Sequence, residues 1–430
     1  MRLRDKIDIA DINMIYFSSY RMKVHRPMPI VVCYLLFLAY CIRNFLRFEF
    51  RYTRSHKVLF VVPTLNNKRT LEPIYSKLDE ADYTCIQGSW MGLPRTRLAW
   101  YSLVRLLDFH RMYRSLNTED KRLVRHFYLR FMTTYGVYHT CHELLRRNPD
   151  LKMIVMANDH ISVCRILRML APQYGVETLY TQHASVTERF PSLQFTYSFL
   201  DGIESYEKYA TIGNIRGKVY LSGSPRFDVL GKLRVAQADS HRIGIACNSI
   251  DRLQRVVELA AYLIAHTDYE VVVRPHPEML KNFPEALFAD SRISISRPDC
   301  ETPFEFISKL KVLIANESSI HLDSLLVGIP TILYNFTENA TIDWYGYLRN
   351  GLMPKCDSKE HIIRYIDEAA LSAAKAKYYY AAYGTAYEYN VGTLIAHFIQ
   401  GRIGRQDNVL DSIFVDRGAY YDYKSQKPCD

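Results

Sequence analysis

Two segments in the second half of the chain hold residue types that bind phosphate. Arg274 and His276 follow an apolar run, in the sequence Glu-Val-Val-Val-Arg-Pro-His-Pro. Because side chains alternate along a strand, both are expected to project to one side near its carboxyl end. Ser318 and Ser319 follow a second apolar run, 313–315, and precede a predicted helix. The free N–H groups of a helix N-terminus, two hydroxyls and the Arg/His pair would together suit the phosphates of a nucleotide.

Two more residues complete the predicted donor-binding set. Asn248 follows a predicted strand at 242–247, and Glu317 immediately precedes the paired serines. A carboxylate beside bound phosphate would repel it, so Glu317 is expected to contact a ribose hydroxyl or a neighbouring loop. The alternative roles are structural: the serines or Asn316 would cap the helix, and His276 would cap a turn before its proline.

The elements that must position these residues alternate between strand and helix. This order predicts an α/β protein with two doubly wound, Rossmann-like domains, whose ligands lie in a cleft at the carboxyl ends of the strands. Helices are expected at 162–170, 252–265 and 304–310, and through most of 96–147. Strands are expected at 57–63, 83–87, 151–157, 176–181, 199–206, 218–221, 242–247, 269–273, 293–295, 311–316 and 331–334.

Four units follow from this reading of the 430 residues. They are a basic apolar arm at 1–56, an N-terminal acceptor domain at 57–235, a C-terminal nucleotide-donor domain at 236–385 and a helical tail at 386–430. Nine scattered cysteines without C-x-x-C spacing argue against a zinc site and a disulfide framework, and indicate a reducing compartment.

The arm concentrates positive charge around an apolar segment. Residues 1–57 hold eleven Lys/Arg and four acids, a net +7 out of +10 for the chain, and they enclose an uncharged stretch at 27–42. As a helix this stretch spans roughly 24 Å, less than the roughly 30 Å of a bilayer core. We expect an interfacial or re-entrant helix at the cytoplasmic leaflet. A buried core helix is the first alternative and a single membrane span the second.

Several of these motifs resemble those of a known group of enzymes. The Arg-x-His-Pro stretch and the paired serines resemble the HP and SS motifs of GT-B transferases. That group includes bacterial polysialyltransferases, capsule Kdo transferases and the CDP-glycerol glycerophosphotransferases. The segments Tyr180-Thr-Gln-His-Ala184 and Leu221-Ser-Gly-Ser-Pro-Arg-Phe-Asp228 are similar to the group's Q-H-G and G-x-P-R-x-D segments. The layout is also similar to that of UDP-N-acetylglucosamine 2-epimerases.

The resemblance implies a donor site that needs neither metal nor cofactor. In the group, the HP histidine and the SS serines hold the phosphates of a cytidine nucleotide. Carried over, His276 would donate to the leaving phosphate, and Ser318 and Ser319 would bond other phosphate oxygens. Fixed donors of this kind stabilise the leaving group in place of a metal ion.

The general base has more than one candidate. The histidine of the Q-H-G segment implies His183, although Ala184 replaces the glycine and puts the loop's backbone in doubt. In polysialyltransferases the base is an acid of an acidic-acidic-glycine motif, whose nearest counterpart, Leu200-Asp201-Gly202, has one acid. Glu188 and the loop 158–160 are further candidates, because strand-end loops of the first domain face the cleft.

These expectations together describe a glycosyltransferase or polyol-phosphate transferase of bacterial capsule or other surface polysaccharide synthesis. Its partners would be a nucleotide-activated sugar or polyol donor, cytidine-based as the resemblance implies, a lipid-linked glycan acceptor and the cytoplasmic membrane surface, with no nucleic acid. Two alternatives stay open: an epimerase acting on UDP-N-acetylglucosamine, and a non-catalytic GT-B protein of polysaccharide assembly.

Overall fold

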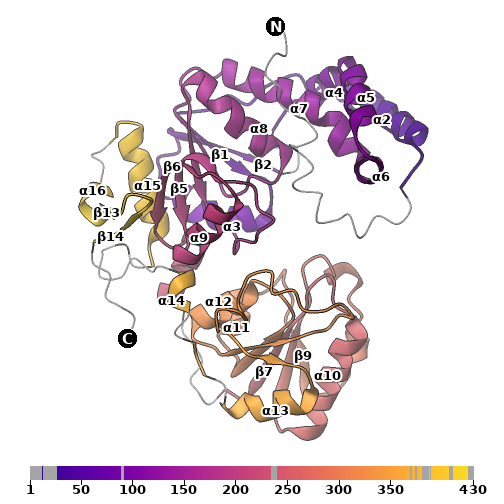
Figure 1. Cartoon of the computed structure of the whole chain (residues 1–430), viewed down its shortest axis with the longest axis vertical. Coiled ribbons are helices and arrows are strands. Elements are labelled where there is room, and N and C mark those ends of the chain that lie inside the picture. The colour runs from indigo at the N-terminus through magenta and orange to yellow at the C-terminus, as the bar shows by residue number, and fades with distance from the viewer. Residues whose placement is uncertain are drawn as a thin grey trace.

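The chain folds around two separate sheets, which Figure 1 shows in two bodies. The computed structural model describes Ile12 and residues 27–88, 92–233, 240–368, 370–372, 375–379, 387, 389–405 and 410–424. The rest of the predicted arm before residue 27 lies outside these residues.

The first sheet has eight strands in the order β13-β14-β6-β5-β4-β3-β1-β2. All its pairings are parallel except that between β13 and β14. Its strands are β1 (Val58–Val62), β2 (Tyr83–Gln87), β3 (Met153–Met156), β4 (Glu177–Thr181), β5 (Gln194–Leu200), β6 (Arg216–Leu221), β13 (Phe414–Asp416) and β14 (Tyr421–Tyr423).

Helices cover both faces of this sheet. In β1 all five residues are buried: Leu59 and Val61 face one core, while Val58, Phe60 and Val62 face the other. A strand buried on both faces is what a parallel sheet between helical layers requires. The helices of this domain are α2 (Ile30–Phe45), α3 (Leu65–Tyr75), α4 (Arg95–Val104), α5 (Leu106–Ser115), α6 (Thr118–His126), α7 (Tyr128–Arg146), α8 (Ser162–Leu170), α9 (Ile203–Ile212), α15 (Val391–Arg402) and α16 (Leu410–Ile413), with the short 3₁₀ helices η2 (Ala171–Tyr174) and η3 (Pro225–Lys232).

The C-terminal segment completes the first domain. Helix α15 packs on the face of the sheet that α3 also covers, and β13 and β14 extend the sheet beyond β6. The tail therefore contains strands as well as the predicted helix, and it belongs to the N-terminal domain. Asp228 fixes its docking, because its two carboxylate oxygens accept the N–H groups of Val391 and Gly392, both at 2.8 Å.

The second sheet has six parallel strands in the order β12-β11-β10-β7-β8-β9. Its strands are β7 (Arg242–Ala246), β8 (Glu270–Arg274), β9 (Ile293–Ile295), β10 (Val312–Ala315), β11 (Thr331–Tyr334) and β12 (Lys355–Cys356). The helices are α10 (Leu253–His266), α11 (Pro303–Ile307), α12 (Ile320–Val327), α13 (Lys359–Glu368) and α14 (Lys375–Tyr378), with η4 (Leu280–Asn282) and η5 (Glu285–Phe288). From β7 the chain builds the sheet first toward β9 and later toward β12, so a topological switch point lies between β7 and β10.

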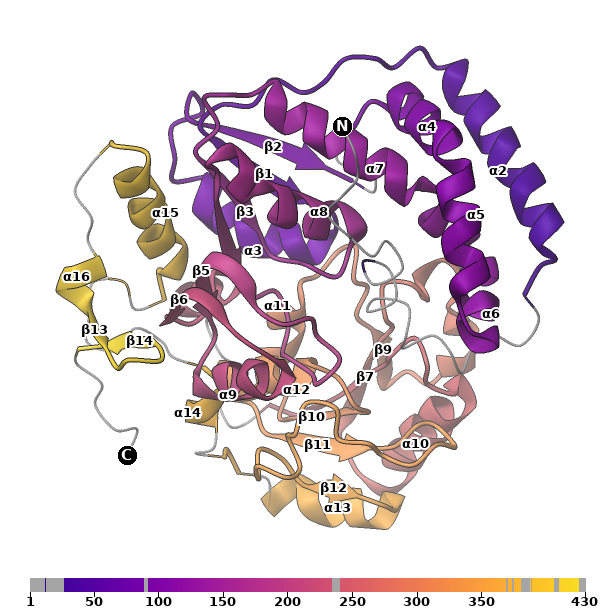
Figure 2. The same cartoon turned by 45° about the horizontal axis from the view of Figure 1, so that its top comes forward.

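The apolar segment of the predicted arm forms α2. One side of α2 packs through Cys33, Phe37 and Cys41 into a helical layer with α4 to α7, at the outer edge of the first domain (Figure 2). Its packed side fits the core-helix alternative, whereas its other side is exposed. Among the described residues, none of the helices is both long enough and apolar enough to cross a bilayer.

One predicted strand is misplaced. The sequence predicts a strand at 199–206, but β5 ends at Leu200 and α9 begins at Ile203. Gly202 lies between the two elements and has an extended backbone. A Cβ at this position would lie 2.7 Å from the Lys377 carbonyl oxygen. The correction matters for the site, because it moves Asp201 from mid-strand to the carboxyl end of β5.

Candidate functional site

The carboxyl ends of β7, β8 and β10 gather the predicted donor-binding residues. These strands are neighbours, with β7 between the other two. Parallel strands lie about 4.8 Å apart, so the loops after β8 and β10 are separated by roughly 10 Å. This distance suits a ligand with several phosphates or a phosphate and a sugar.

Helix α12 begins without a capping side chain. Its N-cap residue is Ser319, whose hydroxyl makes no capping hydrogen bond. The Ser318 hydroxyl accepts the Ile320 N–H at a long 3.4 Å. The predicted capping alternative is therefore weak for both serines. An N-terminus that its own side chains leave unsatisfied retains N–H groups and hydroxyls for an anion.

A polar network holds the loop before α12 against the loop after β7. The Asn316 amide donates to Asp251 at 2.7 Å, and the other Asp251 oxygen accepts the Asn248 N–H at 2.7 Å. The Asn248 side chain donates to the Glu317 carbonyl at 3.1 Å. Asn248 thus joins the two sides of the switch point, and in this structure its amide group supports the loop.

Glu317 contacts a neighbouring loop, one of the two roles considered for it. Its carboxylate accepts the Ile342 N–H at 2.9 Å and the Trp344 N–H at 2.8 Å. These bonds fix the segment that follows β11 over the switch point. Glu317 therefore uses both carboxylate oxygens within the protein.

Arg274 and His276 have different surroundings. Arg274 is buried, and its guanidinium donates to the Ser296 hydroxyl at 2.7 Å and the Glu301 carbonyl at 2.8 Å. Burial lowers its pKa to about 10, which leaves it charged at neutral pH. Arg274 thus braces the loop after β9, so the expectation that it projects beside His276 toward a ligand is not what the contacts show.

His276 keeps one ring nitrogen for a ligand. Its side chain is 37% exposed, and Nδ1 accepts the Glu278 N–H at 3.3 Å. Burial lowers the pKa of His276, so the ring is neutral at pH 7. With Nδ1 accepting, the proton of the neutral ring is on Nε2, which can donate to a phosphate oxygen.

In the first domain, the loop after β4 is built around Gln182. Its side-chain nitrogen donates to the Ala184 carbonyl and the Ser205 hydroxyl, both at 3.0 Å, while its side-chain oxygen accepts the Asp201 N–H at 3.1 Å. The Gln182 carbonyl accepts the Ser224 hydroxyl at 3.0 Å. This network brings the ends of β4, β5 and β6 together even though alanine replaces the glycine of the Q-H-G pattern.

His183 lies in the same loop, between Gln182 and Ala184, and its ring is half-buried. Burial, together with the charge of Arg226, lowers the pKa of His183 to about 4. The ring of His160, from the loop after β3, lies 6.4 Å away between centroids. Its pKa is also lowered, to about 3, by burial and by His183. Both histidines are therefore neutral at pH 7.

Asp201, Arg226 and Asp323 form a buried cluster across the domain boundary. Arg226, from the G-x-P-R-x-D segment, lies 3.8 Å from the Asp201 carboxylate and 3.3 Å from that of Asp323 on α12. Asp201 is 1% exposed, and in the described part of the chain neither of its oxygens accepts a hydrogen bond of ordinary geometry. Burial raises the pKa of Asp201 to about 7, against the opposing charge of Arg226.

Other contacts join the two domains beside this cluster. The hydroxyls of Ser185 and Tyr347 lie 2.5 Å apart, and Lys208 donates to the Tyr345 carbonyl at 2.6 Å. Glu188, a predicted catalytic candidate, is an exposed side chain 3.9 Å from Arg349. Glu188 therefore lies at the rim of the domain contact and outside the buried cluster.

Arg226, Arg69 and Asp323 are not among the residues that the sequence predicts for the site. The sequence contains a signal that could have identified Arg226, because it is the arginine of the G-x-P-R-x-D segment. Arg69, on α3, lies near enough for its charge to lower the pKa of both Asp323 and Arg274. No local pattern could identify Arg69 or Asp323, since their proximity arises only from the packing of the domains.

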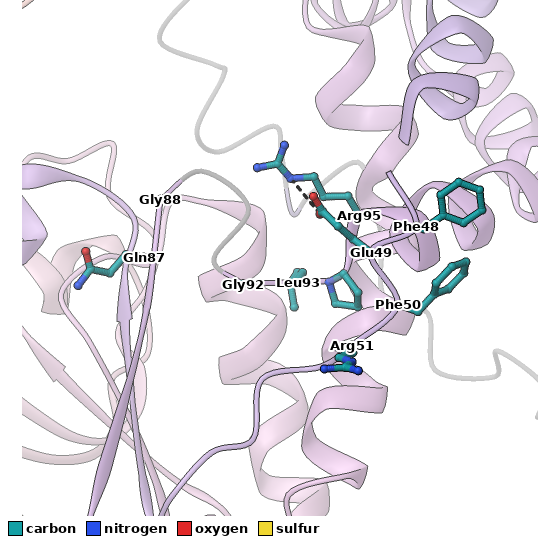
Figure 3. A pocket seen from close by; sticks show the side chains of 10 residues that line it. Phe48, Glu49, Phe50, Arg51, Gln87, Gly88, Gly92, Leu93 and Arg95 are labelled. Carbon is teal, nitrogen blue, oxygen red and sulfur yellow. Dashed lines mark ion pairs between the residues drawn. The ribbon is translucent and has the colours of Figure 1, made fainter. Parts of the chain in front are cut away.

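A cavity of about 660 Å³ lies elsewhere, at the end of β2 (Figure 3). Its lining includes Phe48, Phe50 and Arg51 from the segment after α2, and Arg95 at the start of α4. Arg95 pairs with Glu49 at 3.5 Å. No group of three or more His, Cys, Asp or Glu residues within the described ranges is arranged to hold a metal ion.

Neither a protein-family model nor a curated protein matches the sequence, but solved structures match its fold. The UDP complex of MnaA from S. aureus superposes with a TM-score of 0.52 at 12% identity, covering 82% of this chain and 98% of that one. UDP-GlcNAc 2-epimerase from Methanocaldococcus jannaschii, in complex with UDP-GlcNAc and UDP, superposes with a TM-score of 0.51 at 12% identity, covering 80% of this chain and 99% of that one. The calicheamicin glycosyltransferase CalG4 superposes with a TM-score of 0.52 at 10% identity, covering 82% of this chain and 99% of that one.

The chain has the GT-B fold. In a GT-B protein two Rossmann-like domains face each other at the carboxyl ends of their strands, and both halves of the site described above lie there.

Proposed function

We propose that this GT-B protein is a transferase that moves a group from a nucleotide-activated donor to an acceptor hydroxyl. The observation that carries the proposal is a pair of facing sites at the domain boundary. On one side is the uncapped start of α12 with Ser318 and Ser319, and on the other a buried carboxylate, Asp201, whose pKa lies near 7.

The second domain would bind the donor. Its phosphates would lie at the switch point, where the N–H groups of α12, the two serine hydroxyls and His276 Nε2 can donate to them. The bond between the transferred group and the phosphate breaks with its electron pair leaving on oxygen, so donors fixed in advance stabilise the charge that develops there.

The first domain would supply the general base. A base works best when its pKa lies near the working pH, since it is then both ionised and strong enough to take a proton. Asp201, with a pKa of about 7, meets this condition better than His183, with a pKa of about 4. We therefore assign proton removal from the acceptor hydroxyl to Asp201 and an orienting role to His183.

Domain motion is part of this proposal. Arg226 holds carboxylates of both domains, and Asp201 and Asp323 are 1% and 8% exposed. A substrate reaches Asp201 only when this contact opens, and closure then excludes water from the reacting groups. Arg226 would be released from Asp323 in the open form.

The finer assignment rests on the sequence motifs. Their resemblance to bacterial polysaccharide transferases supports a cytidine-based sugar or polyol donor and a lipid-linked glycan acceptor in capsule or surface polysaccharide synthesis. The described contacts fit a cytosine and a uracil base equally, so a binding experiment must identify the nucleotide.

An epimerase acting on UDP-N-acetylglucosamine is the second candidate. The observation that favours it is the fold likeness to the S. aureus and M. jannaschii proteins, together with several buried acids of raised pKa at the domain boundary. An epimerase removes and returns a proton on the donor itself and needs no acceptor.

A donor panel separates these functions. CMP-Kdo, CMP-sialic acid, CDP-glycerol, CDP-ribitol and UDP-N-acetylglucosamine are supplied singly, with and without membrane lipid acceptors. Nucleotide release and conversion of the donor to another sugar nucleotide are both followed. Release from a cytidine donor only with acceptor, abolished by Asp201→Asn, supports the transferase. Turnover of UDP-N-acetylglucosamine without acceptor overturns it in favour of the epimerase. A preceding thermal-shift series with CMP, CDP, UDP and GDP identifies the nucleotide, because a ligand of the native state raises its melting temperature.

A further inference from the structure

One face of the first domain gathers exposed apolar side chains. Of eighteen large hydrophobic side chains exposed in the described ranges, twelve belong to residues 31–50 and 100–107. We name these twelve the apolar band. Its most exposed members include Leu46 at 70%, Phe48 at 73% and Leu107 at 71%. Single exposed hydrophobics are ordinary on a protein surface, whereas a gathered set marks an interaction site.

Helix α2 supplies most of the apolar band because it is apolar on two opposite sides. Cys33, Phe37 and Cys41 are buried against the neighbouring helices. Val31, Leu35, Leu38 and Ile42, spaced by three or four residues, are 38–65% exposed on the other side. A helix at a protein surface usually turns polar residues outward. In α2 the sole charged residue is Arg43, in its last turn.

The two segments that carry the apolar band are basic. Residues 27–57 hold five Lys/Arg and one acid, and residues 95–130 hold nine and three, so the two segments carry +4 and +6. These two net charges add up to the +10 of the whole chain, so all other residues together have a net charge of zero. Glu49 and Asp108, which pair with arginines here, are already included in that count.

The cavity at the end of β2 opens at the edge of the apolar band. Phe48 and Phe50 line it together with Glu49, Arg51 and Arg95, so aromatic and charged side chains meet at this margin (Figure 3). Aromatic rings beside arginines suit the boundary between lipid headgroups and acyl chains.

We propose that this face docks on a bilayer that contains anionic phospholipid, with α2 parallel to the surface and the apolar band immersed in the interface. Charge decides between lipid and a second copy of the chain. Two copies joined through this face would oppose their basic segments, whereas an anionic surface attracts them. The inference goes beyond the proposed function and does not depend on it, since vesicle binding is measured without donor or acceptor.

The first experiment is flotation of the full-length protein with phosphatidylcholine vesicles and with vesicles that also contain phosphatidylglycerol. We expect the protein to be recovered with the anionic vesicles, and about tenfold less of it with the neutral ones. The reason is that attraction between several arginines and anionic headgroups adds to the free energy of burying apolar side chains. Trp100, which is 56% exposed in the apolar band, should be quenched by brominated acyl chains, and Trp100→Phe should remove that part of the quenching.

Matched substitutions identify the face. Leu35→Gln with Ile42→Gln should reduce vesicle binding by at least about tenfold, since each removes an apolar side chain from the interface. Leu287→Gln, at a residue 50% exposed on the second domain, should leave binding unchanged. Arg43→Gln with Arg47→Gln should weaken binding to anionic vesicles, while the exposed Arg364→Gln on α13 should not.

Three outcomes would overturn the proposal. The first is failure of the full-length protein to float with either vesicle. The second is binding that Leu287→Gln reduces as much as the double α2 variant does. The third is a dimer in analytical ultracentrifugation that the double α2 variant dissociates, which would assign the apolar band to a second copy. Circular dichroism of each variant confirms that the fold is retained.

Discussion

A single guanidinium joins carboxylates from both domains. Arg226 lies between Asp201 at the end of β5 and Asp323 on α12. Burial raises the pKa of both acids, and the charge of Arg226 opposes that rise at each of them.

Asp201→Asn tests the proposed base. The substitution keeps the size of the side chain and removes its basicity, so we expect kcat to fall by about 100-fold or more, with nucleotide affinity within about threefold. Steady-state kinetics and nucleotide titration measure the two quantities. Asp290→Asn, at an exposed acid of the second domain, is the control. Unchanged kcat in Asp201→Asn would return the role to His183.

His276→Ala tests the phosphate contact. Loss of the Nε2 donor should reduce transition-state stabilisation by about 2–4 kcal/mol, while the half-exposed ring contributes little to the core. The measurement is kcat/KM of His276→Ala, compared with that of a control variant, His361→Ala, at an exposed residue of α13. Wild-type turnover by His276→Ala would contradict the phosphate role.

At the scale of elements, a loop of the first domain caps a helix that returns from the far end of the sequence. Asp228 accepts two N–H groups at the start of α15, and α15 covers one face of the first sheet. The G-x-P-R-x-D segment thus has two functions: its arginine reaches across the domain boundary, and its aspartate holds the C-terminal segment in place.

Asp228→Ala should destabilise the first domain by about 1–2 kcal/mol, because two amides at the start of a buried helix lose their acceptor. Urea unfolding, followed by far-UV circular dichroism, measures the difference. The exposed Asp411→Ala on α16 should change stability little. Equal stability of Asp228→Ala and the wild type would show that α15 docks without this cap.

At the scale of the whole molecule, several buried acids make stability depend on pH. Burial raises the pKa of Asp201 and Glu204 to about 7, and of Asp159 to about 6. Since the ordinary value for aspartate is 3.8, the native state binds these protons more tightly than the unfolded chain. The stabilisation is therefore complete below about pH 4 and is lost as pH rises through about 7.

We expect Asp201→Asn to flatten this dependence. The wild type should lose stability between pH 5 and 7 with a contribution from Asp201 of about 1 kcal/mol per pH unit, which the variant lacks. Urea unfolding at a series of pH values gives the slopes, and Asp290→Asn should keep the wild-type slope. Parallel curves for the wild type and Asp201→Asn would contradict the raised pKa.

The resemblance of its motifs to known transferases implied the GT-B fold. The sequence by itself determined the order of strands and helices, their arrangement in two doubly wound domains and the loops with phosphate-binding residues. These follow from local patterns: apolar runs for buried strands, three- and four-residue spacing for helices, and polar residues at strand ends. The strand at β5 was misplaced because Phe199, Leu200, Ile203 and Tyr206 suit either element, and local sequence does not show that Gly202 separates β5 from α9.

Only the tertiary structure decided which side chains meet. Asp201, Arg226 and Asp323 are distant in sequence, and packing of the domains brings them together. Packing within the second domain turns Arg274 toward Ser296 and Glu301, although strand alternation placed it beside His276. Packing within the first domain buries one side of α2 and exposes the other, which composition cannot distinguish because both sides are apolar. Contacts between distant segments, and the burial that shifts a pKa, exist only once the chain has folded.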